Sequence, residues 1–219
     1  MNSSSELKLY TPIIPRELAA IPGFLFVAIL VANILILVTF NRMKTMKLQH
    51  YFMCVLSVND LLTISTLLPS IIGISQGYVW LSDDHCKLIA ILSHIFVATT
   101  DWLYCVICVE RSYSILRPLD HRTLLIKYKP KSLAIKLSGV MILFVMTTII
   151  ALTYTNVLTA TFDTSFGMCL YAIDWQYFTS MGVLFCIVPL VIEVVTHLLI
   201  LMKMKKSGIQ GRKRIVKAI

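Results

Sequence analysis

The sequence has 219 residues, of which 58% are hydrophobic and only 14% are charged, and its mean hydropathy is +0.82. A soluble domain could not cover so much apolar surface, because soluble domains carry about a quarter charged residues. The same composition excludes a disordered or low-complexity chain and a small secreted disulfide scaffold, which leaves a multi-span membrane protein.

Five stretches of the sequence are long and apolar enough to cross a bilayer as helices, which takes about 20 residues. They are residues 18–40, 51–74, 88–109, 133–154 and 177–202. Strands of a membrane barrel would instead alternate apolar and polar residues over about ten positions. We therefore predict an all-α membrane helical bundle, with residues 1–17 as an N-terminal tail and 203–219 as a C-terminal segment.

Lysine and arginine lie mostly on one side of the predicted membrane. The N-terminal tail and the loops on its side carry three of them, and the opposite side carries the other 17 of the 20. The positive-inside rule then places the N-terminus outside the cell and the C-terminus in the cytoplasm, as in a multi-pass protein of the plasma membrane. The net charge of +9 could also suit nucleic-acid binding, but its uneven distribution argues against that partner.

Features of the predicted outer face agree with this orientation. The first 17 residues lack the apolar core of a signal peptide, so the first span is expected to be an uncleaved anchor. Asn2 begins a potential N-glycosylation motif. Cys86, just before the third span, and Cys169, in the next outer loop, lie where disulfides form and persist. We expect a bridge between them, with two free thiols as the alternative.

The third predicted span carries a largely polar stripe at helical spacing. Its members are Ser93, Val97, Thr100 with Asp101, Tyr104, Cys108 and Arg111. A lipid-facing stripe would be apolar, so we expect this helix to be central in the bundle. Asp60 and Glu193 are two further acids within spans. Such acids should face the bundle or a wet cavity, either as functional groups or as polar contacts between helices.

Several of these motifs resemble those of the rhodopsin-like (class A) G protein-coupled receptors. In chain order they are Val31-Ala32-Asn33, Leu56 to Leu62 around Asp60, Pro69, Trp80 with Cys86, Glu110-Arg111-Ser112 with Pro118-Leu119, and Phe185 with Pro189. The resemblance covers essentially the whole chain. Each motif alone is weak, but their order and the 25 residues from Cys86 to Arg111 match the family pattern.

The resemblance implies a receptor, not an enzyme, that binds an extracellular ligand and signals to a heterotrimeric G protein. It assigns Ser93, His94 and Val97 to the ligand pocket, and Asp60, Asn33 and Thr100 to a pocket for an allosteric sodium ion. Glu110 and Arg111 would form the activation switch, and Pro118 and Leu119 would contact the G protein. Pro189 would kink the fifth span. In this scheme Glu110 would pair with Arg111 and hold the inactive state.

The sequence also departs from the family pattern. Ser112 replaces the usual aromatic residue, His197 a tyrosine and Asp101 an aliphatic residue. Ser93 stands where amine receptors carry an aspartate, which disfavours an amine ligand. The family has seven spans and five are predicted here, so we expect the sequence to be a fragment of a longer receptor. Expressed alone, the 219-residue chain should then fail to stimulate nucleotide exchange on a G protein.

A transporter or channel that uses Asp60, Asp101 and Glu193 as a proton or cation path is the alternative function. The sequence has no paired inverted halves and no matching Gly/Pro-broken spans, which counts against this class. An enzyme is disfavoured because the chain has no His-Glu-x-x-His or Gly-x-Ser-x-Gly motif and no glycine loop that would cradle a phosphate.

Overall fold

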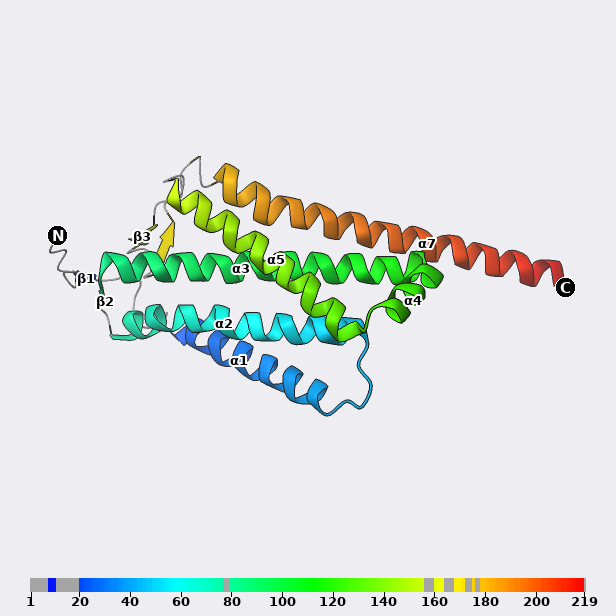
Figure 1. The fold of residues 1–219 in the computed structure, drawn as a ribbon, viewed down its shortest axis with the longest axis horizontal. Helices are drawn as coiled ribbons and strands as arrows, with labels where there is room; N and C mark the ends of the chain where they lie inside the picture. Colours follow the sequence, from blue (N-terminus) through cyan, green and yellow to red (C-terminus); the bar gives the residue numbers. More distant parts are fainter. Residues whose placement is uncertain are drawn as a thin grey trace.

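The computed structural model of the chain describes residues 8–10, 20–76, 79–155, 160–163, 168–171, 175 and 178–218. Its elements in order are β1 (Lys8–Tyr10), α1 (Ala20–Asn41), α2 (Leu48–Gln76), β2 (Val79–Leu81), α3 (Asp83–Leu116), α4 (Pro118–Lys127), α5 (Pro130–Tyr154), β3 (Ala160–Asp163), β4 (Met168–Tyr171), the π-helix η2 (Phe178–Ile187) and α7 (Val188–Ala218). The long helices lie along one axis, and the far end of α7 extends beyond the rest of the bundle (Figure 1).

Five helices are long and apolar enough to cross a membrane. They are Ala20–Asn41, Leu48–Gln76, Asp84–Leu116, Pro130–Tyr154 and Gly182–Lys205. The predicted helical membrane bundle is thus confirmed. The third helix extends beyond the predicted 88–109 at both ends, because hydropathy detects only the part of a helix that lies in hydrocarbon. Its added first turn is capped by Ser82, whose hydroxyl accepts a hydrogen bond from the His85 N–H at 3.3 Å.

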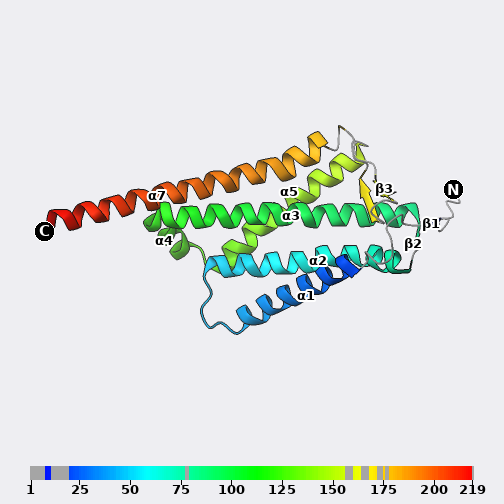
Figure 2. The same cartoon turned by 180° about the vertical axis from the view of Figure 1, so that it is seen from behind.

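Helix α3 is the centre of the bundle, as its polar stripe predicts. It packs against α2, α5 and α7, and two opposite views show it between α2 and α7 (Figures 1 and 2). One apolar cluster joins α3 to α5 and η2 through Ile95, Ala98, Val145, Ile149 and Phe185. A second cluster, nearer the other end, joins α2, α3 and α5 through Leu48, Phe52, Leu56, Leu103, Ile107 and Ala134.

Two short antiparallel strand pairs were not expected from the sequence. Strand β1 pairs with β2, and β3 pairs with β4 in a register that sets Phe162 opposite Cys169. Both pairs lie at the end of the bundle where the N-terminus is found (Figure 2). Strands β3 and β4 both contact α3, so this hairpin covers the beginning of that helix. The fold is otherwise helical.

The helix type changes just before Pro189, and the kink predicted at that residue stays a prediction. The π-helical turns of η2 end at Ile187, and the regular α-helix of α7 begins at Val188. A proline lacks the N–H that would bond four residues back, and its ring crowds that carbonyl, here the one of Phe185. Wider π turns directly before a proline relieve this crowding.

A further helix, α4, occupies a segment for which no helix was predicted from the sequence. Pro118 starts this helix, Asp120 lies in its first turn and Lys127 in its last turn. A proline at the first position and charges that oppose the helix dipole favour a helix here. The ten-residue helix α4 packs against the end of α3.

Candidate functional site

The beginning of α3 is tied to the β3–β4 hairpin by the expected disulfide. Cys86 in the first turn of α3 and Cys169 on β4 form an S–S bond of 2.09 Å, and each residue is only 3% exposed. Ala90, one turn along α3, completes a small buried cluster with the two cysteines. The bridge therefore holds the hairpin over the first turns of α3.

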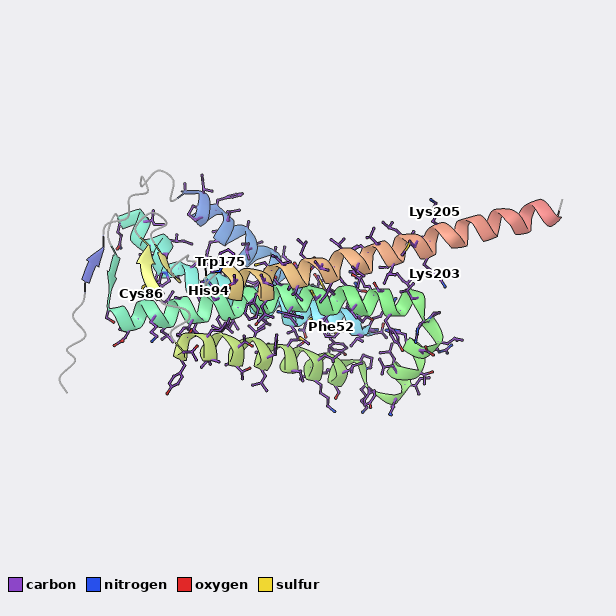
Figure 3. The ribbon with its side chains drawn as sticks, turned by 90° about the horizontal axis from the view of Figure 1, so that it is seen from above. Phe52, Cys86, His94, Trp175, Lys203 and Lys205 are labelled. Carbon is purple, nitrogen blue, oxygen red and sulfur yellow. A yellow bond between two sulfur atoms is a disulfide. The ribbon has the colours of Figure 1, made fainter. Side chains whose placement is uncertain are left out.

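Ser93 and His94 lie directly inward of this bridge on α3. Both side chains hydrogen-bond the carbonyl of Ala90, Ser93 Oγ at 3.1 Å and His94 Nδ1 at 2.9 Å. Figure 3 shows His94 a short distance along the bundle from Cys86. Val97 leaves half of its surface exposed, at 50%. The three residues predicted for the ligand pocket thus share the outer half of α3, and their contact with a ligand stays a prediction.

The middle of the bundle contains a polar network between α2 and α3. Asn59 donates from Nδ2 to the carbonyl of Phe96 and to the hydroxyl of Thr100, both at 2.8 Å. The Thr100 hydroxyl in turn donates to Asp60 Oδ1 at 3.1 Å. Asn59 was not among the predicted site residues, although it precedes Asp60 in the motif. It is buried, and its two bonds fix α2 against α3.

Oxygen atoms of the kind that bind sodium lie beside Asp60. The Asp60 carboxylate and the Thr100 hydroxyl contribute oxygen atoms, which hard cations prefer. The Asn33 amide nitrogen donates to the carbonyl of Ile29 in its own helix, at 3.0 Å. The structure thus brings Thr100 into contact with Asp60, and the sodium ion stays a prediction. Among the described residues no cluster of three or more His, Cys, Asp or Glu forms a metal site.

Helices α3 and α7 meet along a seam with a regular register. The Cys105 thiol donates to the carbonyl of Pro189 at 3.3 Å, and the Ser112 hydroxyl donates to the carbonyl of Thr196 at 3.2 Å. Both pairs are separated by 84 residues in sequence, so the two helices run in the same direction. The small, buried Ser112 thus replaces the usual aromatic residue with a hydrogen bond to the neighbouring backbone.

The acids Asp101 and Glu193 also lie near this seam, on α3 and α7. Both side chains are partly buried, and they lie on two helices that pack against each other. Neither forms an ion pair with another described residue. The structure therefore places two of the three intramembrane acids on facing helices, while Asp60 lies in the separate network with α2.

Near the C-terminal end of α3 the structure corrects the expected pairing of Glu110 with Arg111. The Glu110 carboxylate instead contacts His121 on α4, with 3.0 Å between Oε1 and Nε2. Tyr113 also packs edge-on against the His121 ring. Adjacent residues on a helix point in different directions, so Glu110 and Arg111 reach different neighbours.

Arg111 lies beside the first turn of α2, where it meets Gln49. With the Gln49 amide oxygen turned toward the guanidinium, it accepts a bond from Arg111 Nε at 2.9 Å and another from Nη2. Side-chain amides can be oriented either way because their oxygen and nitrogen atoms look alike, and the hydrogen-bond partners decide the orientation. Gln49 and His121 were not expected from the sequence, since both contacts join segments far apart along the chain.

The exposed surface of α4 carries apolar side chains that no described part of the chain covers. Leu119 and Ile126 are each 79% exposed. Beneath α4, an apolar cavity of 340 Å³ extends toward Trp102 and is bordered at its end by Glu110 and His121. Pro118 therefore acts as the first residue of a helix, and Leu119 lies on an exposed apolar surface as expected for a contact residue. Asn2, the predicted glycosylation site, lies outside the described residues.

Comparison with known proteins identifies relatives of this chain. Residues 32–218 match the family described as 7 transmembrane receptor (rhodopsin family). A QRFP-like peptide receptor from Branchiostoma floridae is 31% identical over 105 residues, which is 47% of this chain and 28% of the relative. The match thus spans little more than a quarter of that relative's length.

Proposed function

This chain belongs to the rhodopsin family of seven-transmembrane receptors, and we propose that it binds an extracellular ligand and transmits that binding to a heterotrimeric G protein. The observation that carries the proposal is the architecture of α3. One continuous helix joins the disulfide-tied hairpin at Cys86 to the Glu110–Arg111 pair at its other end. A transporter or channel is not favoured, because the family match covers most of the chain.

A peptide is the proposed class of ligand. The relative from Branchiostoma floridae is a peptide receptor by its name, and Ser93 takes the place of the aspartate that would bind an amine. A peptide would contact the β3–β4 hairpin as well as the outer half of α3. The disulfide favours this mode of binding, because it holds the hairpin in a fixed position over the helix.

The inner end of α3 would change its partners upon activation. In the described state Arg111 bonds Gln49 on α2, and Glu110 bonds His121 on α4. A G protein that binds better once Arg111 is released would shift the population toward the released state. The exposed apolar residues of α4, Leu119 among them, would add contact area for that partner.

An allosteric sodium ion is proposed at Asp60, with Thr100 and Asn33 beside it. The ion would supply positive charge that offsets the buried carboxylate. Thr100 would have to turn its hydroxyl hydrogen away from Asp60, which would loosen the link from Asn59 through Thr100 to the carboxylate. Sodium would thus act on the same contacts that hold α2 to α3.

The proposed orientation has the N-terminus outside and the Glu110–Arg111 end of α3 in the cytoplasm of a plasma-membrane protein. The lysine and arginine asymmetry supports it, with 17 of the 20 residues on one side. The helix ends agree with this assignment. The strand pairs and the disulfide share one end of the bundle, and α4 lies at the other (Figure 1).

The function is tested in cells that express the full coding sequence of the receptor gene. A library of synthetic peptides, with biogenic amines for comparison, is applied while G protein dissociation is followed by energy transfer. We expect a peptide, and no amine, to give a concentration-dependent signal. Arg111→Ala should abolish that signal at equal surface expression, while Arg122→Ala, an exposed cation on α4, should preserve it. An Arg111→Ala receptor with full response would contradict the proposal.

A further inference from the structure

An apolar groove lies at the inner ends of α1 and α2, away from the sites described above. Its volume is 460 Å³, and its lining includes Leu37, Val38 and Phe40 from the last turn of α1, Met46 from the connecting loop, and Tyr51 and Cys54 from α2. Cys54 follows the first residue of α2 by six positions, which is about 9 Å along a helix axis. The groove therefore extends from the loop past residue 51, where the predicted apolar span of α2 begins.

Three cations border the loop end of this groove. Arg42 follows the lining residue Asn41, Lys47 follows the lining residue Met46, and Lys44 lies between them. All three side chains are exposed. The loop is held in a turn by backbone bonds from Arg42 to Thr39 and from Met43 to Phe40, at 3.2 and 3.1 Å. The positive charges are thus concentrated at one end of an otherwise apolar site.

No acidic residue in the described part of the chain neutralises these charges. The sequence contains no Asp or Glu between Glu17 and Asp60. None of the three cations forms an ion pair with any residue in the described part of the chain. Unpaired cations at the membrane surface attract anionic lipids, and each contributes about 1 kcal/mol to that attraction.

We propose that this groove binds an anionic glycerophospholipid of the cytoplasmic leaflet. One acyl chain would lie along the groove against Val38 and Cys54, and the phosphate would contact Arg42, Lys44 and Lys47. Apolar side chains below and positive charges above match the two parts of such a lipid, and a zwitterionic lipid would lack the net charge. The inference depends on the proposed orientation, which places this loop in the cytoplasm.

The test measures lipid binding to the purified full chain in neutral detergent, by native mass spectrometry. The probes are phosphatidylinositol 4-phosphate, phosphatidylcholine and free inositol phosphate. In the groove variant, Arg42, Lys44 and Lys47 are all changed to Gln. The matched control changes Lys127, Lys129 and Lys131 to Gln, which removes three equally exposed charges from the turn between α4 and α5. A third variant, Val38→Trp, fills the groove without altering charge.

We expect the groove variant to bind the anionic lipid at least about tenfold more weakly, from the loss of three attractive charges. The control should change binding less than about twofold, because its cations do not border the groove. Val38→Trp should also weaken lipid binding, and phosphatidylcholine and free inositol phosphate should bind weakly to the unaltered chain. Equal loss in both charge variants, or free inositol phosphate competing as well as the lipid, would overturn the proposal.

A second readout needs no substitution. Cys54 lines the groove, whereas Cys186 is an exposed thiol on η2. Anionic lipid should slow alkylation of Cys54 by a membrane-permeant maleimide relative to phosphatidylcholine, and leave Cys186 unaffected. A rate at Cys54 that is independent of the lipid, as when another protein segment covers the groove, would overturn the proposal. Because neither readout uses a peptide or a G protein, this result and that of the signalling test are independent.

Discussion

Glu110 on α3 and His121 on α4 approach to 3.0 Å, and their side chains are only 13% and 15% exposed. This pair joins the short helix α4 to α3, while the neighbouring Arg111 bonds Gln49 instead. The switch proposed for this receptor therefore has two separate attachments, one to α4 and one to α2, where the sequence suggested a single contact between adjacent residues.

Removal of the histidine should raise basal signalling. A hydrogen bond to a charged group contributes about 1.5–3 kcal/mol, and about 1.4 kcal/mol corresponds to a tenfold change in an equilibrium. We expect His121→Ala to release α4 from α3 and to increase ligand-independent nucleotide exchange, measured at equal receptor density. His121→Gln, which can still donate to Glu110, should lie close to the unaltered receptor. Basal exchange that is unchanged in His121→Ala would show that this pair does not hold the resting state.

Loss of the disulfide should destabilise the protein, and the two cysteines should not act additively. Cys86 and Cys169 are 83 residues apart, and closing a loop of this length contributes up to about 4 kcal/mol in the chain-entropy picture. The membrane already restricts the chain, so the measured loss should be smaller. We expect Cys86→Ser, Cys169→Ser and the double variant to lower the melting temperature equally, and Cys186→Ser to leave it unchanged. A double variant that melts well below both singles would exclude the shared bond.

The orientation predicts glycosylation of the N-terminal tail. Asn2 lies in an Asn-Ser-Ser motif that would face the secretory lumen during synthesis. Endoglycosidase treatment should increase the gel mobility of the protein, and Asn2→Gln should abolish that shift. If Asn2 is not glycosylated, an epitope at the N-terminus should still be stained on intact cells. Staining that requires permeabilised cells would reverse the assigned orientation.

The network around Asn59 predicts a specific loss of stability. Asn59→Ala removes the hydrogen bonds to both Phe96 O and the Thr100 hydroxyl, and each such bond contributes about 0.5–1.5 kcal/mol. We expect a clear fall in thermal stability in detergent. Ser65→Ala is the control, because the exposed Ser65 hydroxyl bonds only its own helix, and surface changes stay within about 0.5 kcal/mol. Equal effects of the two changes would refute the role assigned to Asn59.

Replacing sodium should affect the receptor through Asp60. If the ion favours the resting state, exchange of sodium chloride for choline chloride should increase peptide affinity or basal signalling. Asp60→Asn removes the charge that would hold the ion, and it should make the receptor insensitive to this exchange. A sodium effect that persists in Asp60→Asn would place the ion elsewhere.

Much of the architecture could be predicted from the sequence because spans in a bilayer are continuous apolar runs. The central position of α3 followed from its polar stripe, since polar residues avoid lipid. The short helix α4 was missed, because ten residues with mixed polarity give no hydropathy signal. Pro118 at its start and Lys127 at its end were the available signals. The strand pairs were missed for a similar reason, since each strand has only three or four residues.

The sequence predicted which residues form the candidate site, but not which residues they contact. Asp60, Thr100 and Cys86 could be located because each occupies a fixed place in a motif. The partners Gln49 and His121 could not, because they reach α3 from other helices and depend on how far each helix is rotated. Asn59 could have been anticipated, since a buried span with two adjacent polar residues needs a partner for each.

The seam between α3 and α7 limits how the receptor can move. Cys105 and Ser112 are seven residues apart, and so are the two carbonyls that they reach, at Pro189 and Thr196. Because the intervals match on two parallel helices, a rigid shift of α7 along its axis would break both hydrogen bonds together. Axial sliding of α7 would have to advance by a whole turn of about 5.4 Å to find equivalent carbonyls. Smaller displacements of α7 must therefore be rolling or tilting motions about this seam that keep both hydrogen bonds to α3.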